Sequence, residues 1–250
     1  MDDLAIIILA AGKGTRMKSD IAKVLHPVAG KSMINHVITC ASALTRDHIH
    51  VVVGHQAEQV KTEVLKSLPV CFAYQEQLLG TGDAVRAALP GIEDSIKSVL
   101  VLCGDVPLIR KRTVQDLVNA HIKVKSKLSV VAVKVDTPKG YGRIVIDPQG
   151  GLSAIREESD ASEAEKHIDL VNSGIYCFDR NFLEAAIRLI ENKNSQGEYY
   201  LTDLVEIAVS QNVKTLVQQI DEPDQVMGVN TPEELGRAEF LFGQIQNELS

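Results

Sequence analysis

The residues most able to do chemistry lie near the start of the chain, where a glycine-rich segment is followed by two cations. Gly12 and Gly14 come directly after an apolar run, and Arg16 and Lys23 follow them. Glycines let backbone N–H groups approach an anion closely, and two cations can offset the charge of a triphosphate. Without the cations, a bare Gly-x-Gly would indicate only a tight turn between a strand and a helix. The segment therefore predicts a phosphate-binding loop.

Two common phosphate loops do not fit this segment. A Walker A loop needs glycine directly before Lys18-Ser19, and the dinucleotide pattern Gly-x-Gly-x-x-Gly needs it at the same place, but Met17 stands there. The second apolar run also ends at Val53 without the acidic residue that would hold a ribose in a dinucleotide fold. Neither a P-loop ATPase nor a dinucleotide-binding enzyme is indicated.

Asp105 and Gln75 are the next candidates, because each follows an apolar run. Asp105 should lie at the carboxyl end of a strand, where open α/β sheets bind ligands, although alone it also fits an Asp that caps a turn. The amide of Gln75 can both donate and accept hydrogen bonds, which suits recognition of a polar ligand, although alone it also fits a solvated loop residue. The chain contains no His-Glu-x-x-His pair and no Gly-x-Ser-x-Gly elbow.

The elements that must position these residues alternate along the first half. Apolar runs separated by amphipathic segments predict parallel strands joined by crossover helices. After Ser129 the pattern changes to strands joined by short turns, which predicts a β-rich lobe. The charged stretch 157–169 predicts a mobile surface loop that could act as a lid, and Thr231 with Pro232 and Glu234 predicts the start of the last helix. The predicted strands are 4–9, 49–53, 70–74, 99–102, 129–135, 143–146 and 152–156, and the clearest helix is 56–68.

Composition narrows the class of protein further. The chain has 250 residues and a net charge of −7, which argues against a nucleic-acid partner because such binding needs a basic face. No apolar run approaches the roughly 20 residues that cross a bilayer, so we expect no membrane partner. The four cysteines lie in apolar sequence without CxxC spacing, which predicts reduced core residues in a cytoplasmic protein.

Six blocks along the chain carry a family resemblance. They are Leu9–Met17 with Lys23-Val24-Leu25, Gln75 with Gly80-Thr81-Gly82, Gly104–Leu108, Gly140–Arg143, Asn172–Tyr176 and Gly197–Asp203. Together they resemble the sugar-nucleotide nucleotidyltransferases, and most closely the N-acetylglucosamine-1-phosphate uridylyltransferases that form the N-terminal half of a bifunctional enzyme. The resemblance implies an α/β fold, with a Rossmann-like, mostly parallel mixed sheet flanked by helices and a smaller β-rich sugar-binding lobe.

The resemblance also implies a set of site residues. Arg16 and Lys23 would act on the triphosphate, and Asp105 with Asn230 would bind Mg²⁺, which takes its remaining ligands from waters and phosphates. The sugar would contact the second half of the chain, with Glu157 less secure because Glu158 is adjacent. The implied nucleotide-binding residues are Leu9, Ala10, Ala11, Gly12, Gly14, Thr15, Gln75, Gly80 and Thr81, and the implied sugar-binding residues are Gly140, Glu157, Asn172, Tyr200 and Thr202.

The activity implied is transfer of uridylyl from UTP to N-acetylglucosamine 1-phosphate, giving UDP-N-acetylglucosamine for cell-envelope synthesis. We expect one domain over 1–250, with a nucleotide lobe (1–128), a sugar lobe (129–230) and a C-terminal helix (231–250). The hexapeptide repeats of the bifunctional relatives do not occur, so we expect no acetyltransferase domain, and a monomer or weak oligomer unless such a domain builds a trimer. Another nucleotide or sugar phosphate, or a non-catalytic sugar-nucleotide-binding module, remains an alternative.

Three positions differ from the family pattern. Leu78 stands where a second Gln is usual, Asp83 where His is common, and Cys103 where Tyr is frequent. None of them removes a proposed phosphate or metal group. Leu78 could loosen contacts near the base, so the preference for UTP over dTTP or CTP is less firmly predicted than the reaction.

Overall fold

The apolar runs of the first half form the centre of one sheet. The computed structural model describes residues 3–249, and in it β1 (Leu4–Leu9) pairs in parallel with β4 (Ile49–Val53) on one side and β6 (Ser98–Cys103) on the other. These strands are buried along almost their whole length. Strands covered by helices on both faces consist of near-continuous apolar residues, which is the pattern the sequence shows.

The second half of the chain extends the same sheet. Within the described residues the strand order is β11-β7-β10-β6-β1-β4-β5, and β10 runs antiparallel to both of its neighbours while the other pairs are parallel. The hairpin of β8 and β9 joins this sheet through β10. The predicted mixed, mostly parallel sheet is confirmed. The remaining strands are β5 (Cys71–Tyr74), β7 (Leu128–Lys134), β8 (Arg143–Ile146), β9 (Leu152–Arg156), β10 (Leu170–Asp179) and β11 (Thr215–Ile220).

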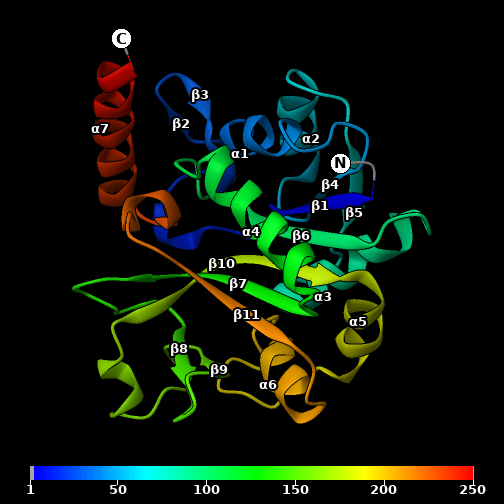
Figure 1. The fold of residues 1–250 in the computed structure, drawn as a ribbon. Coiled ribbons are helices and arrows are strands. Elements are labelled where there is room, and N and C mark those ends of the chain that lie inside the picture. Colours follow the sequence, from blue (N-terminus) through cyan, green and yellow to red (C-terminus); the bar gives the residue numbers. More distant parts are fainter. Residues whose placement is uncertain (1–2, 250) are drawn as a thin grey trace.

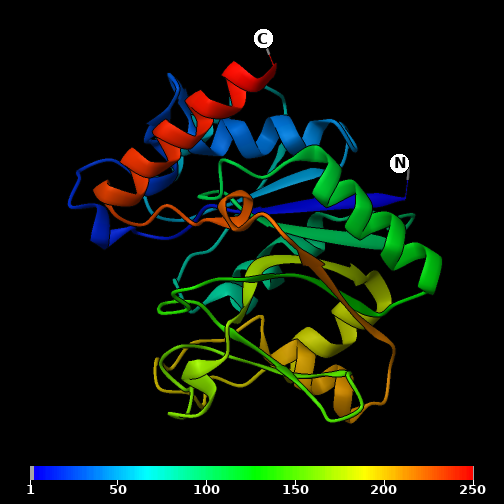
Figure 2. The ribbon, with the colours of Figure 1, turned by 60° about the vertical axis from the view of Figure 1, so that its left-hand side comes forward.

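Helices cover both faces of the sheet. Alternate side chains of β1 enter opposite core clusters, Leu4, Ile6 and Ile8 in one and Ala5 and Ile7 in the other. The first cluster is covered by α1, α2 and α4 and the second by α3, α5 and α6, and Figures 1 and 2 show these helices on opposite sides of the strands. Their bounds are α1 (Met33–Ser42), α2 (Ala57–Leu65), α3 (Thr81–Ala88), α4 (Lys111–Val124), α5 (Arg180–Ala186) and α6 (Asp203–Ser210).

The last helix, α7 (Pro232–Leu249), lies outside these layers, against the small hairpin of β2 (Pro27–Val28) and β3 (Lys31–Ser32) (Figure 2). Its start has the predicted capping arrangement. The Thr231 hydroxyl accepts from the Glu234 N–H at 3.2 Å, and the Glu234 carboxylate accepts from the backbone of Asn230 at 2.6 Å and Thr231 at 3.1 Å. The helix start is therefore tied to the residue predicted to bind metal.

Two expectations need correction. The strands after Ser129 do not form a separate hairpin-rich layer, since β7, β10 and β11 belong to the main sheet and only β8 and β9 form a hairpin. The thiols are all free, but Cys71 is exposed, so the prediction of a core position is wrong for this residue. The reason is that β5 is the edge strand and is largely uncovered. The lobe boundaries proposed from the sequence remain a prediction.

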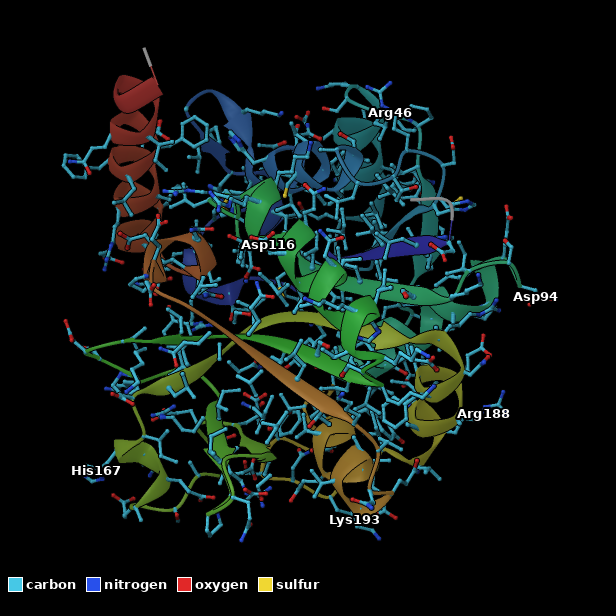
Figure 3. The ribbon with its side chains drawn as sticks, in the orientation of Figure 1. Arg46, Asp94, Asp116, His167, Arg188 and Lys193 are labelled. Atoms are coloured by element: carbon cyan, nitrogen blue, oxygen red, sulfur yellow. The ribbon has the colours of Figure 1, made fainter. Side chains whose placement is uncertain are left out.

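The stretch 157–169 is irregular and lies at the periphery. It contains one 3-10 turn at Glu165–His167, and Figure 3 shows His167 projecting outward from it. Its beginning is held because the carbonyl of Glu157 accepts from the N–H groups of Asp160 and Ala161. Its role as a mobile lid stays a prediction. Within residues 3–249, no helix is long and apolar enough to cross a membrane.

Candidate active site

The glycine-rich loop leaves β1 and borders a cavity of about 270 Å³ at the carboxyl ends of the central strands. Gly14 has a φ of +63°, and a Cβ there would collide with the side chain of Lys23. Glycine therefore allows the loop to lie against Lys23. Nine of the predicted site residues line this cavity: Leu9, Ala10, Ala11, Gly12, Lys23, Gln75, Gly80, Thr81 and Asp105.

Three other predicted loop residues do not line the cavity. Gly14 lies against the Lys23 side chain, and Thr15 and Arg16 are exposed in a single 3-10 turn. Among the described residues Arg16 has no hydrogen-bond or ion-pair partner, so its guanidinium is free to meet a phosphate that reaches the loop. The structure does not bring Arg16 together with Lys23, and its triphosphate role remains a proposal.

Lys23 lies between the two predicted metal ligands. Its ammonium donates to Asp105 Oδ2 and, at 2.8 Å, to Asn230 Oδ1. The Asn230 amide nitrogen donates to the carbonyl of Gly228 at 3.0 Å, which turns the amide oxygen toward the cation. The backbone of Val229 also donates to the Asp105 carbonyl at 2.9 Å. The oxygens of Asp105 and Asn230, which come from distant parts of the chain, therefore both accept from the ammonium of Lys23.

A metal at this place would have few protein ligands. Residues 3–249 contain no cluster of three or more His, Cys, Asp or Glu side chains able to hold a metal ion. The carboxylate of Asp105 and the amide oxygen of Asn230 are nevertheless the donor types that Mg²⁺ takes, and they already face a cation. The donor set fits a metal that obtains its other ligands from phosphates and water.

Gln75 is held firmly on the other side of the cavity. It is 6% exposed, and its side-chain nitrogen donates to the Gly80 carbonyl at 3.0 Å and to Asp83 Oδ2 at 2.9 Å. Its backbone N–H donates to Val53 at 2.9 Å, because the chain continues the β4–β5 pairing by one residue. The orientation of the Gln75 side chain, which lines the cavity, is therefore fixed.

The predicted sugar-binding residues lie on the neighbouring surface, in two settings. Glu157 accepts from the Thr202 hydroxyl at 3.1 Å, and burial raises the pKa of this carboxyl. Glu158 instead pairs with Arg143 and the Gly140 N–H, which places Gly140 beside the exposed glutamate. Of the two glutamates it is therefore Glu157 that contacts Thr202, and its sugar-binding role remains a proposal.

Tyr200 and Asn172 are both engaged within the protein. The Tyr200 hydroxyl donates to Gln196 at 2.9 Å, and the Asn172 side-chain oxygen accepts from the Gly174 N–H at 3.0 Å. Glu157 and Tyr200 border a second cavity of about 300 Å³, whereas Asn172 and Gly140 line neither cavity. The structure therefore groups Glu157 with Tyr200 and Thr202, and Asn172 also lies close to Glu157, because both side chains border Gly142.

Five residues that line this cavity were not among the predicted site residues: Val24, Leu78, Ala84, Cys103 and Glu198. Glu198 is in the block Gly197–Asp203 that carried the resemblance, and its place in that block is the signal that could have indicated a site role. Burial raises the pKa of the Cys103 thiol to about 12, and this thiol is not a nucleophile at neutral pH.

Backbone contacts connect the two sides of the site. The Tyr199 N–H donates to Leu79 and its carbonyl accepts from the Gly82 N–H, each at 2.7 Å. The Thr81 hydroxyl accepts from the Leu201 N–H at 3.0 Å. The segment that carries Tyr200 is thereby bound to the start of α3, next to Gln75.

This combination of a mixed α/β sheet, a glycine loop and a paired carboxylate and amide defines a nucleotide-handling transferase. The family model described as nucleotidyl transferase matches residues 5–222, and the chain belongs to that family. A putative glucose-1-phosphate thymidylyltransferase from Bacillus anthracis, solved in complex with a sucrose, has the same fold, with a TM-score of 0.74 over 95% of this chain and 94% of that one at 20% identity.

Within the family the chain is similar to bifunctional protein GlmU, over its N-terminal half. It is 44% identical over 236 residues to GlmU of Desulfotalea psychrophila, covering 94% of this chain and 69% of that protein. The identity to GlmU of Alcanivorax borkumensis is 46%, covering 98% and 53%, and to GlmU of Geobacter metallireducens it is 43%, covering 100% and 52%. The chain thus spans about half to two thirds of these relatives, and the resemblance seen in the motifs is confirmed.

Proposed function

We propose that this chain transfers uridylyl from UTP to N-acetylglucosamine 1-phosphate, with Mg²⁺, and releases pyrophosphate. The observation that carries the proposal is the convergence of Asp105 and Asn230 on Lys23, which lines one cavity with Asp105, Gln75 and the glycine loop. The similarity to GlmU supports the choice of substrates. The product would serve cell-envelope synthesis in the cytoplasm.

The proposed reaction needs no general base. An oxygen of the sugar phosphate is already anionic near neutral pH, so it can attack the α-phosphorus directly as the bond to pyrophosphate breaks. Positioning and charge neutralisation then supply most of the rate enhancement. Lys23 is placed to do this, because its side chain is only 15% exposed and lines the cavity beside the glycine loop.

Asp105 and Asn230 would hold the Mg²⁺. A bound metal would neutralise phosphate charge and align the two reacting groups. Since Lys23 now supplies the cation for both oxygens, we expect these ligands to bind metal well only when phosphates draw Lys23 away. Metal affinity should therefore rise sharply when nucleotide is present.

The acceptor sugar would lie toward Glu157, Tyr200 and Thr202, which offer a carboxylate and hydroxyls suited to sugar hydroxyls. Asn172, which lies close to Glu157, would contact the same sugar, whereas Gly140 lies beside Glu158. For this chain we propose a monomer or weak oligomer, and a trimer if a β-helix domain is normally attached.

The test is pyrophosphate release from UTP and N-acetylglucosamine 1-phosphate with Mg²⁺, run beside dTTP, CTP and glucose 1-phosphate. Release confined to the first pair is the expected result. Release with only another pair would contradict the proposed substrates but would still support a nucleotidyltransferase reaction. Binding of UDP-N-acetylglucosamine without release from any pair would contradict catalysis and favour a binding module.

A further inference from the structure

The side chain of Gln75 has used both of its donor hydrogens within the protein. Its nitrogen is within hydrogen-bond distance of the Gly80 carbonyl (3.0 Å) and of Asp83 Oδ2 (2.9 Å). Both partners are acceptors only, since a carbonyl and an ionised carboxylate carry no hydrogen. The amide cannot be turned around without placing its oxygen against two other oxygens. The positions of the amide nitrogen and oxygen are therefore determined by these two acceptors.

The atom that remains for a ligand is the Gln75 side-chain oxygen. It has no hydrogen-bond partner among the described residues, and it is not among the fully buried atoms left without one. Gln75 lines the cavity shared with Lys23 and Asp105. The sequence had suggested an amide that both donates and accepts, but the structure leaves only the acceptor.

An acceptor at this position distinguishes pyrimidine bases. Uracil and thymine carry a hydrogen on N3 and can donate to the Gln75 oxygen, whereas N3 of cytosine is an acceptor and would oppose it. A buried acceptor that faces another acceptor costs about 1–3 kcal/mol, which is roughly ten- to hundredfold in affinity. The same edge would be far less selective if the amide nitrogen were free to turn toward the base.

We propose that Asp83 is a positioning residue for base specificity, which holds the Gln75 amide with its oxygen toward the base and so excludes cytosine. This inference deepens the proposed function and rests on its assignment of the nucleotide to this cavity. Asp83 is in the first turn of α3, where the start of the helix places its carboxylate beside Gln75. The Gly80 carbonyl is the second anchor and is already shared with the Ala84 N–H at 3.1 Å.

The test compares UTP with CTP in Asp83→Ala and in a matched control. Asp83→Ala removes the acceptor and frees one amide hydrogen, and the ratio of kcat/KM for UTP over CTP should fall by about tenfold. Asp83→Asn keeps an acceptor oxygen and should lie between wild type and Asp83→Ala. Glu58→Ala is the control, because it removes a first-turn acid from α2, outside the cavity, and should leave the ratio unchanged.

Calorimetric binding of UTP and CTP without the acceptor sugar gives a readout independent of turnover. The affinity ratio should fall in Asp83→Ala as the kinetic ratio does, with thermal unfolding confirming that the variant is folded. A ratio in Asp83→Ala equal to that of Glu58→Ala would overturn the role of Asp83. If wild type binds UTP over CTP but releases no pyrophosphate, the proposed function fails while the inference on Asp83 stands.

Discussion

At the residue scale, the site depends on one ammonium that donates to two oxygens, those of the Asp105 carboxylate and the Asn230 amide. Lys23 is close in sequence to the glycine loop, whereas Asp105 and Asn230 come from the end of β6 and the residue before the α7 cap. Without this ammonium, the carboxylate of Asp105 and the amide oxygen of Asn230 would lose the donor that they share. Lys23 therefore stabilises the free site as well as serving the proposed reaction.

Substitution of Lys23 tests that proposed role in turnover. Lys23→Ala should lower kcat by on the order of 10²- to 10³-fold, because a preorganised donor at the developing charge is lost. The KM for UTP should change less. Steady-state pyrophosphate release measures both, with Lys66→Ala as the control since Lys66 is exposed on the surface. An unchanged kcat in Lys23→Ala would contradict the proposed role of Lys23 in turnover.

Asp203 gives a pH-dependent prediction at the same scale. Burial, with the nearby Glu206 and Glu157, raises the pKa of Asp203 from 3.8 to about 6. The folded protein thus holds this proton to higher pH than the unfolded chain, so ionisation opposes folding. The penalty is absent below pH 3.8, grows between 3.8 and 6 and is complete above 6.

Replacing this carboxyl removes the penalty. Asp203→Asn should raise the free energy of unfolding by about 1 kcal/mol at pH 8, and the gain should shrink toward zero at about pH 3.5. Thermal unfolding at the two pH values measures it. Asp116→Asn, at an exposed position on α4, should show no such pH dependence. A gain that is the same at both pH values would argue against ionisation as the cause.

At the element scale, the cap of α7 has a second function. It ends the chain segment that holds Asn230, and the carboxylate of Glu234 binds the Asn230 backbone directly. The cap therefore fixes the position of a proposed metal ligand as well as the start of a helix. A short sequence pattern predicted this cap because its hydrogen bonds join residues at most four apart.

Loss of the cap should be visible as loss of stability. Thr231→Ala removes the acceptor for the Glu234 N–H and should cost about 1 kcal/mol, or roughly 2–4 °C in Tm. Thermal unfolding measures the change. Thr62→Ala on α2 is the matched control, because Thr62 is exposed inside a helix and caps nothing. Equal Tm values for the two variants would show that the Thr231 cap contributes nothing.

At the scale of the whole molecule, one sheet supports both the residues proposed to bind the nucleotide and those proposed to bind the sugar. The antiparallel strand β10 connects the strands of the first half to β7 and β11, so the halves share a core. The closest link at the site is at Gly80, where φ is +108° and a Cβ would lie 2.7 Å from the Tyr199 carbonyl. Glycine permits this approach, and the Tyr200 segment is held next to the base side.

A side chain at position 80 should weaken the binding of both proposed substrates. Gly80→Ala should lower the free energy of unfolding by about 1–3 kcal/mol and raise the KM for both proposed substrates, since it strains the backbone and pushes Tyr199 away. Thermal unfolding and steady-state kinetics measure these effects. Gly236→Ala in α7 has nothing within 4 Å of the added Cβ and should be neutral or stabilising. An increase in only one KM would show that Gly80 does not couple the sides.

The sequence by itself determined the features that depend on near neighbours. The buried strands β1, β4 and β6, the glycine loop with Lys23, the position of Asp105 after a strand and the cap of α7 follow from local apolar runs and spacing. These signals lie within a few residues of one another, so no knowledge of distant contacts is needed.

The tertiary structure alone decided what depends on residues far apart in the chain. The antiparallel insertion of β10, the exposure of Cys71 on an edge strand and the Lys23–Asn230 contact join segments that no local pattern relates. The direction of the Gln75 amide was also undetermined, because an isolated amide can donate or accept equally well. Only the Gly80 carbonyl and Asp83, held in place by the start of α3, give it one orientation.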